Sequence, residues 1–187
     1  KDLINQAVKC GANAVKFQSY ISSKLAAPET PKVKYQILNS FEENESHLEM
    51  LSKYEISKDD HIILKKYCDS KQIDFLSTPY DVESAKLLTK LNVKMFKTAS
   101  ADIVDYQLHR YIASTYKPTI ISTGMSTIDE ISATLSYYNN FKSSVILLHC
   151  VSNYPCSIGS INLNSIDFLR NKFNLPIGYS DHSSENL

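Results

Sequence analysis

Cationic and hydroxyl side chains follow several short apolar runs of the sequence. In the run at 96–100 (FKTAS), Lys97 precedes Ser100, and Asp102 follows two residues later. Runs of the same form occur at 14–18 (AVKFQ), 75–79 (FLSTP), 120–124 (IISTG), 145–150 (VILLHC) and 177–182 (IGYSDH). Ammonium and hydroxyl groups from several strand ends can hold a phosphate or carboxylate through charge-assisted hydrogen bonds. The pattern predicts an anion site at the C-terminal ends of parallel strands, where barrels carry their chemistry.

Helical segments alternate with these runs and must position them. Apolar periodicity and capping residues predict helices over 2–10, 46–54, 57–70, 81–91, 106–114, 127–138 and 165–174. Strands are expected at 13–17, 74–77, around Lys97, and at 119–121, 145–150 and 177–179, whereas 19–45 is expected to be a long polar connection. The alternation predicts an α/β fold with a parallel sheet.

The residues at the C-terminal ends of the strands favour a barrel over a doubly wound sheet. Every strand ends in polar residues, and the four glycines form no dinucleotide-binding fingerprint. Complete TIM-type (β/α)8 barrels take about 250 residues in eight βα units. The 187 residues therefore predict such a barrel represented by about six of its eight units, with residues 1–187 a partial catalytic domain.

The remaining local predictions concern burial. The helix over 57–70 is expected to bury Ile62, Ile63 and Tyr67. His47, His61 and His109 lie in helical patterns beside charged residues and are expected at the surface. His149 is expected to be a satisfied core histidine, or one that orients a ligand residue, rather than a ligand itself.

Composition excludes several classes of function. The 20 basic and 20 acidic side chains cancel, which argues against binding to nucleic acid or an anionic membrane. No apolar run approaches the roughly 20 residues of a membrane span, and the N-terminus has helical periodicity rather than a signal-peptide pattern. The four cysteines form no CxxC pair, which favours free thiols in a reducing cytoplasm.

Seven motifs together resemble the sialic acid synthase family, which includes the N-acetylneuraminate, legionaminate and pseudaminate synthases. They are KFQ at 16–18, KYQ at 34–36, LSTP at 76–79, FKTAS at 96–100, STGM at 122–125, HCVSNYP at 149–155 and GYSDH at 178–182. The resemblance covers nearly the whole chain, in order.

The resemblance implies a reaction and its partners. Members of the family condense phosphoenolpyruvate with an N-acetylhexosamine, use a divalent metal (Mn²⁺ or Mg²⁺) and release phosphate. The acceptor implied here is N-acetylmannosamine or a diacetamido-trideoxyhexose, and the full-length protein is expected to be a homodimer. The family's first and last strands, with a metal-site glutamate and a second metal histidine, and its C-terminal antifreeze-like domain are expected to lie outside this chain.

The resemblance also assigns roles to residues. Lys97 and Asp102 match catalytic positions, and His182 matches a metal ligand that Asp181 could orient. Asp102 stands where the family usually has glutamate, and Ser152 where some members have asparagine. The matched substrate-binding residues are Lys16, Gln18, Asn39, Thr78, Ser100, Ser122, Ser152, Tyr154 and Ser180.

Simpler interpretations remain open. Either lysine alone could pair with a buried acid, Ser122 and Thr78 could only cap the following helices, and Asp181 could be an N-cap. Two other functions also remain: an aldolase in which Lys97 forms a Schiff base with pyruvate, or an inactive remnant of the barrel.

Overall fold

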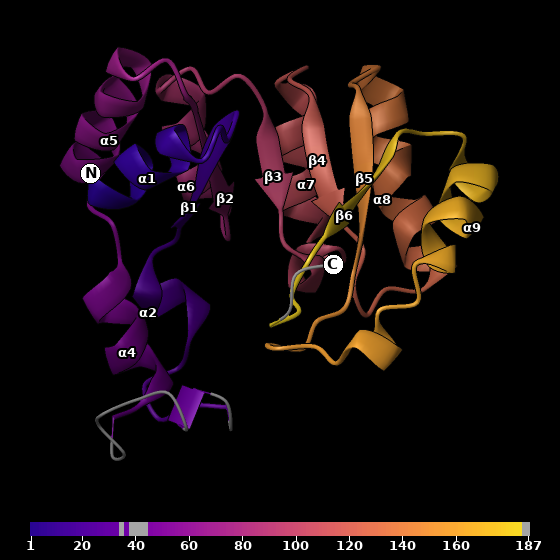
Figure 1. Cartoon of the computed structure of the whole chain (residues 1–187), viewed down its shortest axis with the longest axis horizontal. Coiled ribbons are helices and arrows are strands. Elements are labelled where there is room, and N and C mark those ends of the chain that lie inside the picture. The colour runs from indigo at the N-terminus through magenta and orange to yellow at the C-terminus, as the bar shows by residue number, and fades with distance from the viewer. Residues whose placement is uncertain (34–35, 38–44, 185–187) are drawn as a thin grey trace.

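Helices and parallel strands alternate along the chain in a computed structural model that describes residues 1–33, 36–37 and 45–184 (Figure 1). The strands are β1 (Ala14–Ser19), β2 (Asp74–Pro79), β3 (Phe96–Thr98), β4 (Thr119–Ser122), β5 (Val145–Cys150) and β6 (Ile177–Ser180). The helices are α1 (Asp2–Lys9), α2 (Ser22–Leu25), α4 (His47–Tyr54), α5 (Lys58–Ser70), α6 (Val82–Lys90), α7 (Tyr106–Ser114), α8 (Ile128–Phe141) and α9 (Asn164–Phe173). Short 3-10 turns occur at Ser100–Asp102 and Ile158–Ser160.

The strands form two parallel sheets. One pairs β1 with β2, and the other has the order β3-β4-β5-β6. The two sheets adjoin where β2 lies beside β3. The predicted α/β fold with parallel strands is confirmed, and its closure into a barrel stays a prediction.

The strand register separates two faces. Gln18 pairs with Thr78 and Lys16 with Leu76, so these side chains share one face of the sheet. On the opposite face the rings of Phe17 and Phe75 stack with centroids 5.3 Å apart. Because side chains alternate along a strand, the polar residues at the strand ends lie opposite the apolar core.

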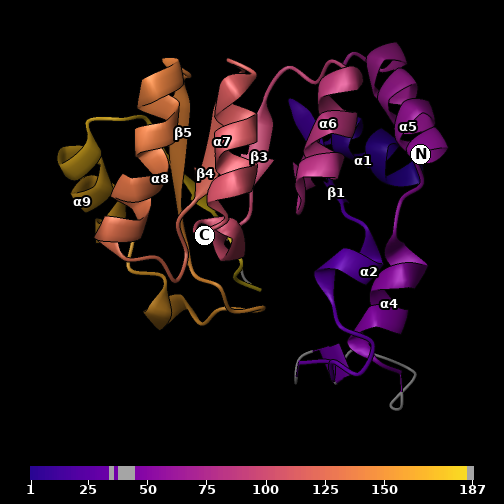
Figure 2. The same cartoon turned by 180° about the vertical axis from the view of Figure 1, so that it is seen from behind.

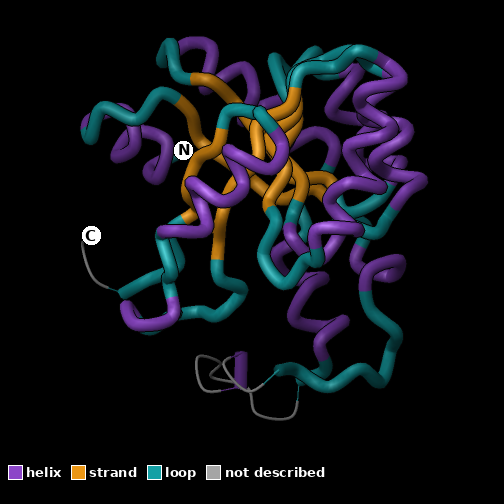
Figure 3. The backbone as a smooth tube through the Cα atoms, turned by 90° about the vertical axis from the view of Figure 1, so that its right-hand side faces the viewer, coloured by secondary structure: helices purple, strands orange, loops and turns teal. Residues whose placement is uncertain are grey.

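The apolar core lies between the sheets and their helices. Figure 2 shows α7 and α8 across the back of β3, β4 and β5, and α6 and α5 beside β1 and β2. In the side view of Figure 3 the strands lie together in the centre, with helices to their right. Fully buried core residues from both layers include Leu88, Phe96, Ile112, Ile131 and Leu147.

The predicted helix starts are confirmed by their caps. The hydroxyl of Ser57 accepts a hydrogen bond from the Asp60 amide, and Asp81 accepts one from Ser84. Thr127 and Glu130 form the expected reciprocal capping box. Among the described residues, no helix is long and apolar enough to cross a bilayer.

The burial predictions for α5 and α7 were partly wrong. Ile62 and Ile63 are 38% and 47% exposed, whereas His61 and His109 are buried. His61 faces the sheet because its ring bonds the Ser19 hydroxyl at 2.6 Å and the Ser57 carbonyl at 2.8 Å. The face of α5 that is turned toward the core is therefore the one that carries His61. The apolar residues Ile62 and Ile63 alone predict a different face.

His109 and His149 are both satisfied by polar partners. His109 bonds the Tyr138 hydroxyl at 2.8 Å and the Asp102 carbonyl at 3.1 Å, and burial lowers its pKa to about 4. His149 bonds the Ile161 carbonyl at 2.6 Å, as expected of a satisfied core histidine.

The expected unstructured connection at 19–45 contains the short helix α2. With α4 it lies on the side of the sheets where β1 and β2 end (Figure 1). The Tyr20 hydroxyl donates to the Leu51 carbonyl at 3.0 Å, and the Ser22 amide donates to Glu55 at 2.7 Å. An ion pair also joins Lys32 to Glu45, and the two side chains are 1% and 7% exposed.

The adjacent residues His61 and Ile62 give a test of this burial pattern. We expect His61→Ala to lower the free energy of unfolding by about 2–4 kcal/mol, because it leaves a cavity and removes one of the two hydrogen-bond partners of buried Ser19. Ile62→Ala should cost less than about 1 kcal/mol, because that side chain is partly exposed. Chemical denaturation monitored by circular dichroism measures both values. Equal losses in the two variants would contradict the assigned helix face.

Candidate active site

Lys97 lies at the centre of the polar side chains at the strand ends. Its ammonium group donates to the Thr98 carbonyl at 2.9 Å and to the Ser122 hydroxyl of β4. The side chain is buried, at 8% exposure. Among the described residues, no carboxylate forms an ion pair with Lys97 or Lys16. Lys97 therefore forms no ion pair with a buried acid in this part of the chain, although the charge of Asp102 favours its protonated form.

The electrostatic environment of Lys97 favours anion binding. Burial, and secondly the positive charge of Lys16, lower the pKa of Lys97 to about 8. Burial also lowers the pKa of Lys16. Burial thus disfavours the charged form of both lysines, and the charge of Lys16 also disfavours that of Lys97. A bound anion would counter both effects. The two predicted cations act on one site.

Ser122 and Thr78 do not cap helices. Thr127 and Asp81 cap the helices that follow these strands, α8 and α6. Ser122 bonds Lys97 instead, and buried Thr78 shares the interior face with Gln18. Both hydroxyls remain candidates for substrate binding.

The ends of β3, β4 and β5 converge at Gly124. The Gly124 amide donates to the Ser100 hydroxyl at 3.0 Å, and Ser100 lies 3.1 Å from the Cys150 sulfur. A Cβ atom at Gly124 would lie 2.5 Å from the Ser152 hydroxyl and 2.9 Å from that sulfur. Glycine is required there because three strand ends approach one another closely. This convergence places predicted residues Ser100 and Ser152 in one cluster.

Asp102 follows β3 in a 3-10 turn and carries an unsatisfied buried atom. Its Oδ2 has no hydrogen-bond partner in the described structure. Burial, and secondly the nearby Asp105, raise the pKa of Asp102 to about 6. A carboxyl group with this pKa can exchange a proton near neutral pH, as a general acid or base requires.

Tyr80 belongs to the same site, although the sequence analysis did not select it. The Gln18 amide donates to the Tyr80 hydroxyl at 2.8 Å. Burial, then the charges of Asp102 and Tyr154, raise the pKa of Tyr80 to about 12. Its position directly after Pro79 at the end of β2 is the signal that could have identified it.

His182 is oriented for a ligand by a backbone carbonyl. Its Nδ1 lies 2.6 Å from the Val151 carbonyl, which can only accept a hydrogen bond, so Nδ1 carries the proton. Nε2 is then an acceptor, 3.2 Å from the Ser180 hydroxyl and 3.4 Å from that of Tyr154. The Tyr154 and His182 rings stack with centroids 4.2 Å apart. This tautomer is the one that a metal bound at Nε2 requires.

Asp181 accepts hydrogen bonds from the Ser183 amide at 2.8 Å and the Tyr179 hydroxyl at 3.3 Å, and within the described residues it caps no helix. It acts on His182 by charge rather than by a hydrogen bond. Its role as an orienter of His182 stays a prediction. Within residues 1–33, 36–37 and 45–184, no three His, Cys, Asp or Glu side chains gather into a metal site. Asn39 and most of the KYQ motif lie outside the described residues.

Comparison with known proteins identifies the family to which these motifs belong. Residues 3–187 match the sequence pattern of the NeuB family. The chain belongs to the NeuB family. N,N'-diacetyllegionaminic acid synthase from Legionella pneumophila is 38% identical over 188 residues, which cover 98% of this chain and 52% of that protein.

Solved structures of relatives agree with this assignment. The structure of N-acetylneuraminic acid (sialic acid) synthetase from Leptospira borgpetersenii, in complex with citrate, matches with a TM-score of 0.85 and 35% identity. The match covers 97% of this chain and 59% of that one. A DAHP synthase from Thermotoga maritima shares the fold, with a TM-score of 0.69 at 14% identity over 97% of this chain and 47% of its own. The NeuB family chain thus spans about half the length of the curated relatives it matches.

Two glycines give a test of the convergence at Gly124. Gly124→Ala should lower the free energy of unfolding by about 1–3 kcal/mol, because the new methyl group forces Ser152 and Cys150 apart. Gly159→Ala should change it by less than about 0.5 kcal/mol, because no atom lies within 4 Å of the new Cβ. Urea denaturation of both variants makes the comparison. An unchanged midpoint for Gly124→Ala would show that the three strand ends are not tightly packed.

Asp102 predicts a pH-dependent stability. Its folded pKa, about 6, exceeds its ordinary value of 3.8, so the ionised form is disfavoured in the folded state. The contribution of Asp102 to stability therefore falls as pH rises from about 4 to about 6. Asp102→Asn should gain up to about 2 kcal/mol relative to the unmodified protein between pH 4 and pH 7. A difference that is the same at both pH values would contradict the raised pKa.

Proposed function

We propose that the protein carrying this chain is a nonulosonic (sialic-type) acid synthase. It condenses phosphoenolpyruvate with an N-acetylhexosamine such as N-acetylmannosamine and releases phosphate. The observation that carries the proposal is the buried Lys97 ammonium, which shares its site with Lys16 and, among the described residues, donates hydrogen bonds to neutral groups. Membership of the NeuB family supports the same reaction class.

Phosphoenolpyruvate would bind at the ends of the strands. Lys97 and Lys16 would neutralise its phosphate and carboxylate, and hydroxyl donors would complete the shell. Ser122 already contacts the Lys97 ammonium, and Ser100 faces Gly124 one strand away. The other hydroxyl candidates, Thr78 and Ser180, are brought to the same face by the strand register.

The acceptor sugar would bind beside the phosphoenolpyruvate, where Asp102 and Tyr154 lie. Carbon–carbon bond formation joins C3 of phosphoenolpyruvate to the sugar aldehyde, water adds at C2, and phosphate leaves. Asp102 is suited to hold or release a proton during these steps because its pKa is about 6. Gln18, Tyr80 and Ser152 would supply neutral hydrogen bonds to the sugar.

A divalent metal, Mn²⁺ or Mg²⁺, is part of this proposal. His182 would hold it through Nε2, because the Val151 carbonyl fixes the proton on Nδ1. When bound, the metal would polarise the aldehyde and lower the pKa of a water molecule. The remaining ligands are proposed to come from parts of the full-length protein beyond this chain.

The proposal includes the architecture and setting of the whole protein. The chain would be part of a (β/α)8 barrel that is followed by a C-terminal antifreeze-like domain. The whole would act as a cytoplasmic homodimer.

A pyruvate aldolase is the second candidate, and one observation favours it. The pKa of Lys97, about 8, leaves part of the amine neutral, as Schiff-base formation requires. Borohydride reduction in the presence of pyruvate would link pyruvate to Lys97 in an aldolase and would leave a synthase unmodified.

Phosphate release from phosphoenolpyruvate is the direct test. The full-length protein should release phosphate only when both N-acetylmannosamine, or another acetamido sugar, and Mn²⁺ are present. Omission of either is the control. A folded, full-length protein that releases no phosphate with any acetamido sugar would contradict the proposal and favour the aldolase or an inactive remnant.

Lys97→Ala should lower kcat/KM by about 100-fold or more, because it removes the buried cation from the anion site. The fold should remain, because the strand keeps its backbone bonds to β4. Lys94, an exposed lysine just before β3, forms an ion pair with Asp74 and provides the matched control. Lys94→Ala should leave turnover unchanged. Near-normal turnover of Lys97→Ala would disprove the assigned anion site.

A further inference from the structure

A cavity lies on the helix-facing side of β1, between α5, α6 and the segment that follows β1. Its volume is about 480 Å³, which is within the range of small-molecule sites. Ser19 and His61 line it, and Ser19 points away from the face that carries Lys16 and Gln18. The cavity therefore lies on the other side of β1 from Lys16 and Gln18, and it meets the candidate active site where the Tyr20 ring contacts Tyr80, with centroids 6.2 Å apart.

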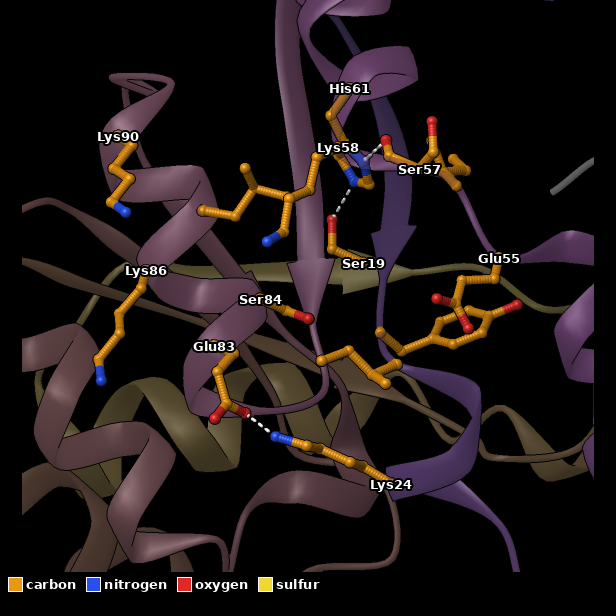
Figure 4. Close-up of a pocket in the computed structure, with 14 residues that line it drawn as sticks. Ser19, Lys24, Glu55, Ser57, Lys58, His61, Glu83, Ser84, Lys86 and Lys90 are labelled. Atoms are coloured by element: carbon orange, nitrogen blue, oxygen red, sulfur yellow. Dashed lines mark hydrogen bonds and ion pairs between the residues drawn. The ribbon is translucent and has the colours of Figure 1, made fainter. Parts of the chain in front are cut away.

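Three lysines give this cavity a positive side. Lys86 and Lys90 lie along α6, and Lys58 reaches from α5 toward that helix (Figure 4). Among the described residues, no hydrogen bond or ion pair engages these three ammonium groups. The charge of Lys86 lowers the pKa of Glu83 without forming an ion pair, so the three ammonium groups keep their hydrogen-bonding capacity for a ligand.

The acidic groups of the cavity are already engaged. Glu83 pairs with Lys24, and Glu55 accepts a hydrogen bond from the Ser22 amide (Figure 4). The cavity lining holds four lysines and two glutamates, so its net charge is positive while His61 is neutral. A cationic ligand would be repelled, and an anionic one attracted.

The rest of the lining is apolar or satisfied. Tyr20, Ile21, Ile56 and Leu87 supply apolar surface. The polar groups at the base of the cavity already have hydrogen-bond partners, because Ser19 bonds both His61 and Ser77 at 2.6 Å. A ligand would thus bind by its charge to the lysines and by an uncharged body to the apolar wall.

We propose that this cavity binds a small organic phosphate, with the phosphate at Lys58, Lys86 and Lys90 and the body against Tyr20 and Leu87. The site is independent of the synthase reaction proposed above. It lies one residue from Gln18 along β1, so a ligand there contacts the back of the strand that supplies Lys16 to the active site.

Titration calorimetry with adenosine monophosphate as the probe tests the proposal. It is performed on the full-length protein carrying Lys97→Ala, so that the active-site anion site is removed. Saturable binding of one probe molecule is expected, and Lys86→Ala/Lys90→Ala should weaken it about tenfold or more. Lys86→Arg/Lys90→Arg should retain it, and Lys66→Ala, an exposed lysine of α5 outside the cavity, should leave it unchanged.

Four results would overturn the proposal. One is the absence of saturable binding in the Lys97→Ala protein. Another is equal weakening by Lys66→Ala, which would indicate non-specific attraction to surface lysines. The third is binding of adenosine as tight as that of adenosine monophosphate, which would remove the role of the phosphate. The fourth is binding of pyrophosphate as tight as that of adenosine monophosphate, which would remove the role of the apolar wall.

Discussion

The burial of the Lys97 ammonium is the constraint on which the candidate site depends. A charged group away from water is unfavourable unless other groups stabilise it, and the described partners of Lys97 are a carbonyl and a hydroxyl. Burial and Lys16 both disfavour the charged form, and the folded structure keeps this unfavourable arrangement. An anion bound between the two lysines would convert repulsion into attraction, so the site is organised for a negatively charged substrate.

Alternation along the parallel strands makes this arrangement possible. One set of residues faces the helices and forms the apolar core, while the intervening set carries Lys16, Lys97 and Ser122 on the other face. The same alternation places Ser19 and His61 behind the active-site strand. Neighbouring residues of one strand thus serve different purposes: one packs in the core and the next faces the candidate site.

Local sequence signals predicted the elements well. The strand at 145–150 and the helix at 106–114 agree with the structure at both ends, because apolar runs and caps such as Asp105 act over a few residues. The sequence also selected residues that the structure brings together, since strand ends in a parallel fold share one edge; their roles in a site stay predictions. The Lys97–Ser122 contact and the convergence at Gly124 follow from that edge.

Long-range partners account for what the sequence did not predict. His61 is buried because Ser19, 42 positions earlier, bonds its ring, and His109 because Tyr138 lies on the next helix. The orientation of His182 depends on a backbone carbonyl 31 positions away, which no residue type encodes. Tyr80 joins the site through Gln18, its neighbour only across the strand pair. Such contacts arise from the packing of distant elements.

The pKa of the Lys97 amine tests the central claim most directly. NMR titration of the ¹³Cε signals, with Lys97→Arg to assign the resonance, would measure it with and without phosphoenolpyruvate. In the free protein the pKa should lie near 8, and it should rise when phosphoenolpyruvate binds, because a neighbouring anion stabilises the charged form. A value at the ordinary 10.5 that phosphoenolpyruvate leaves unchanged would show that Lys97 is not part of a buried anion site.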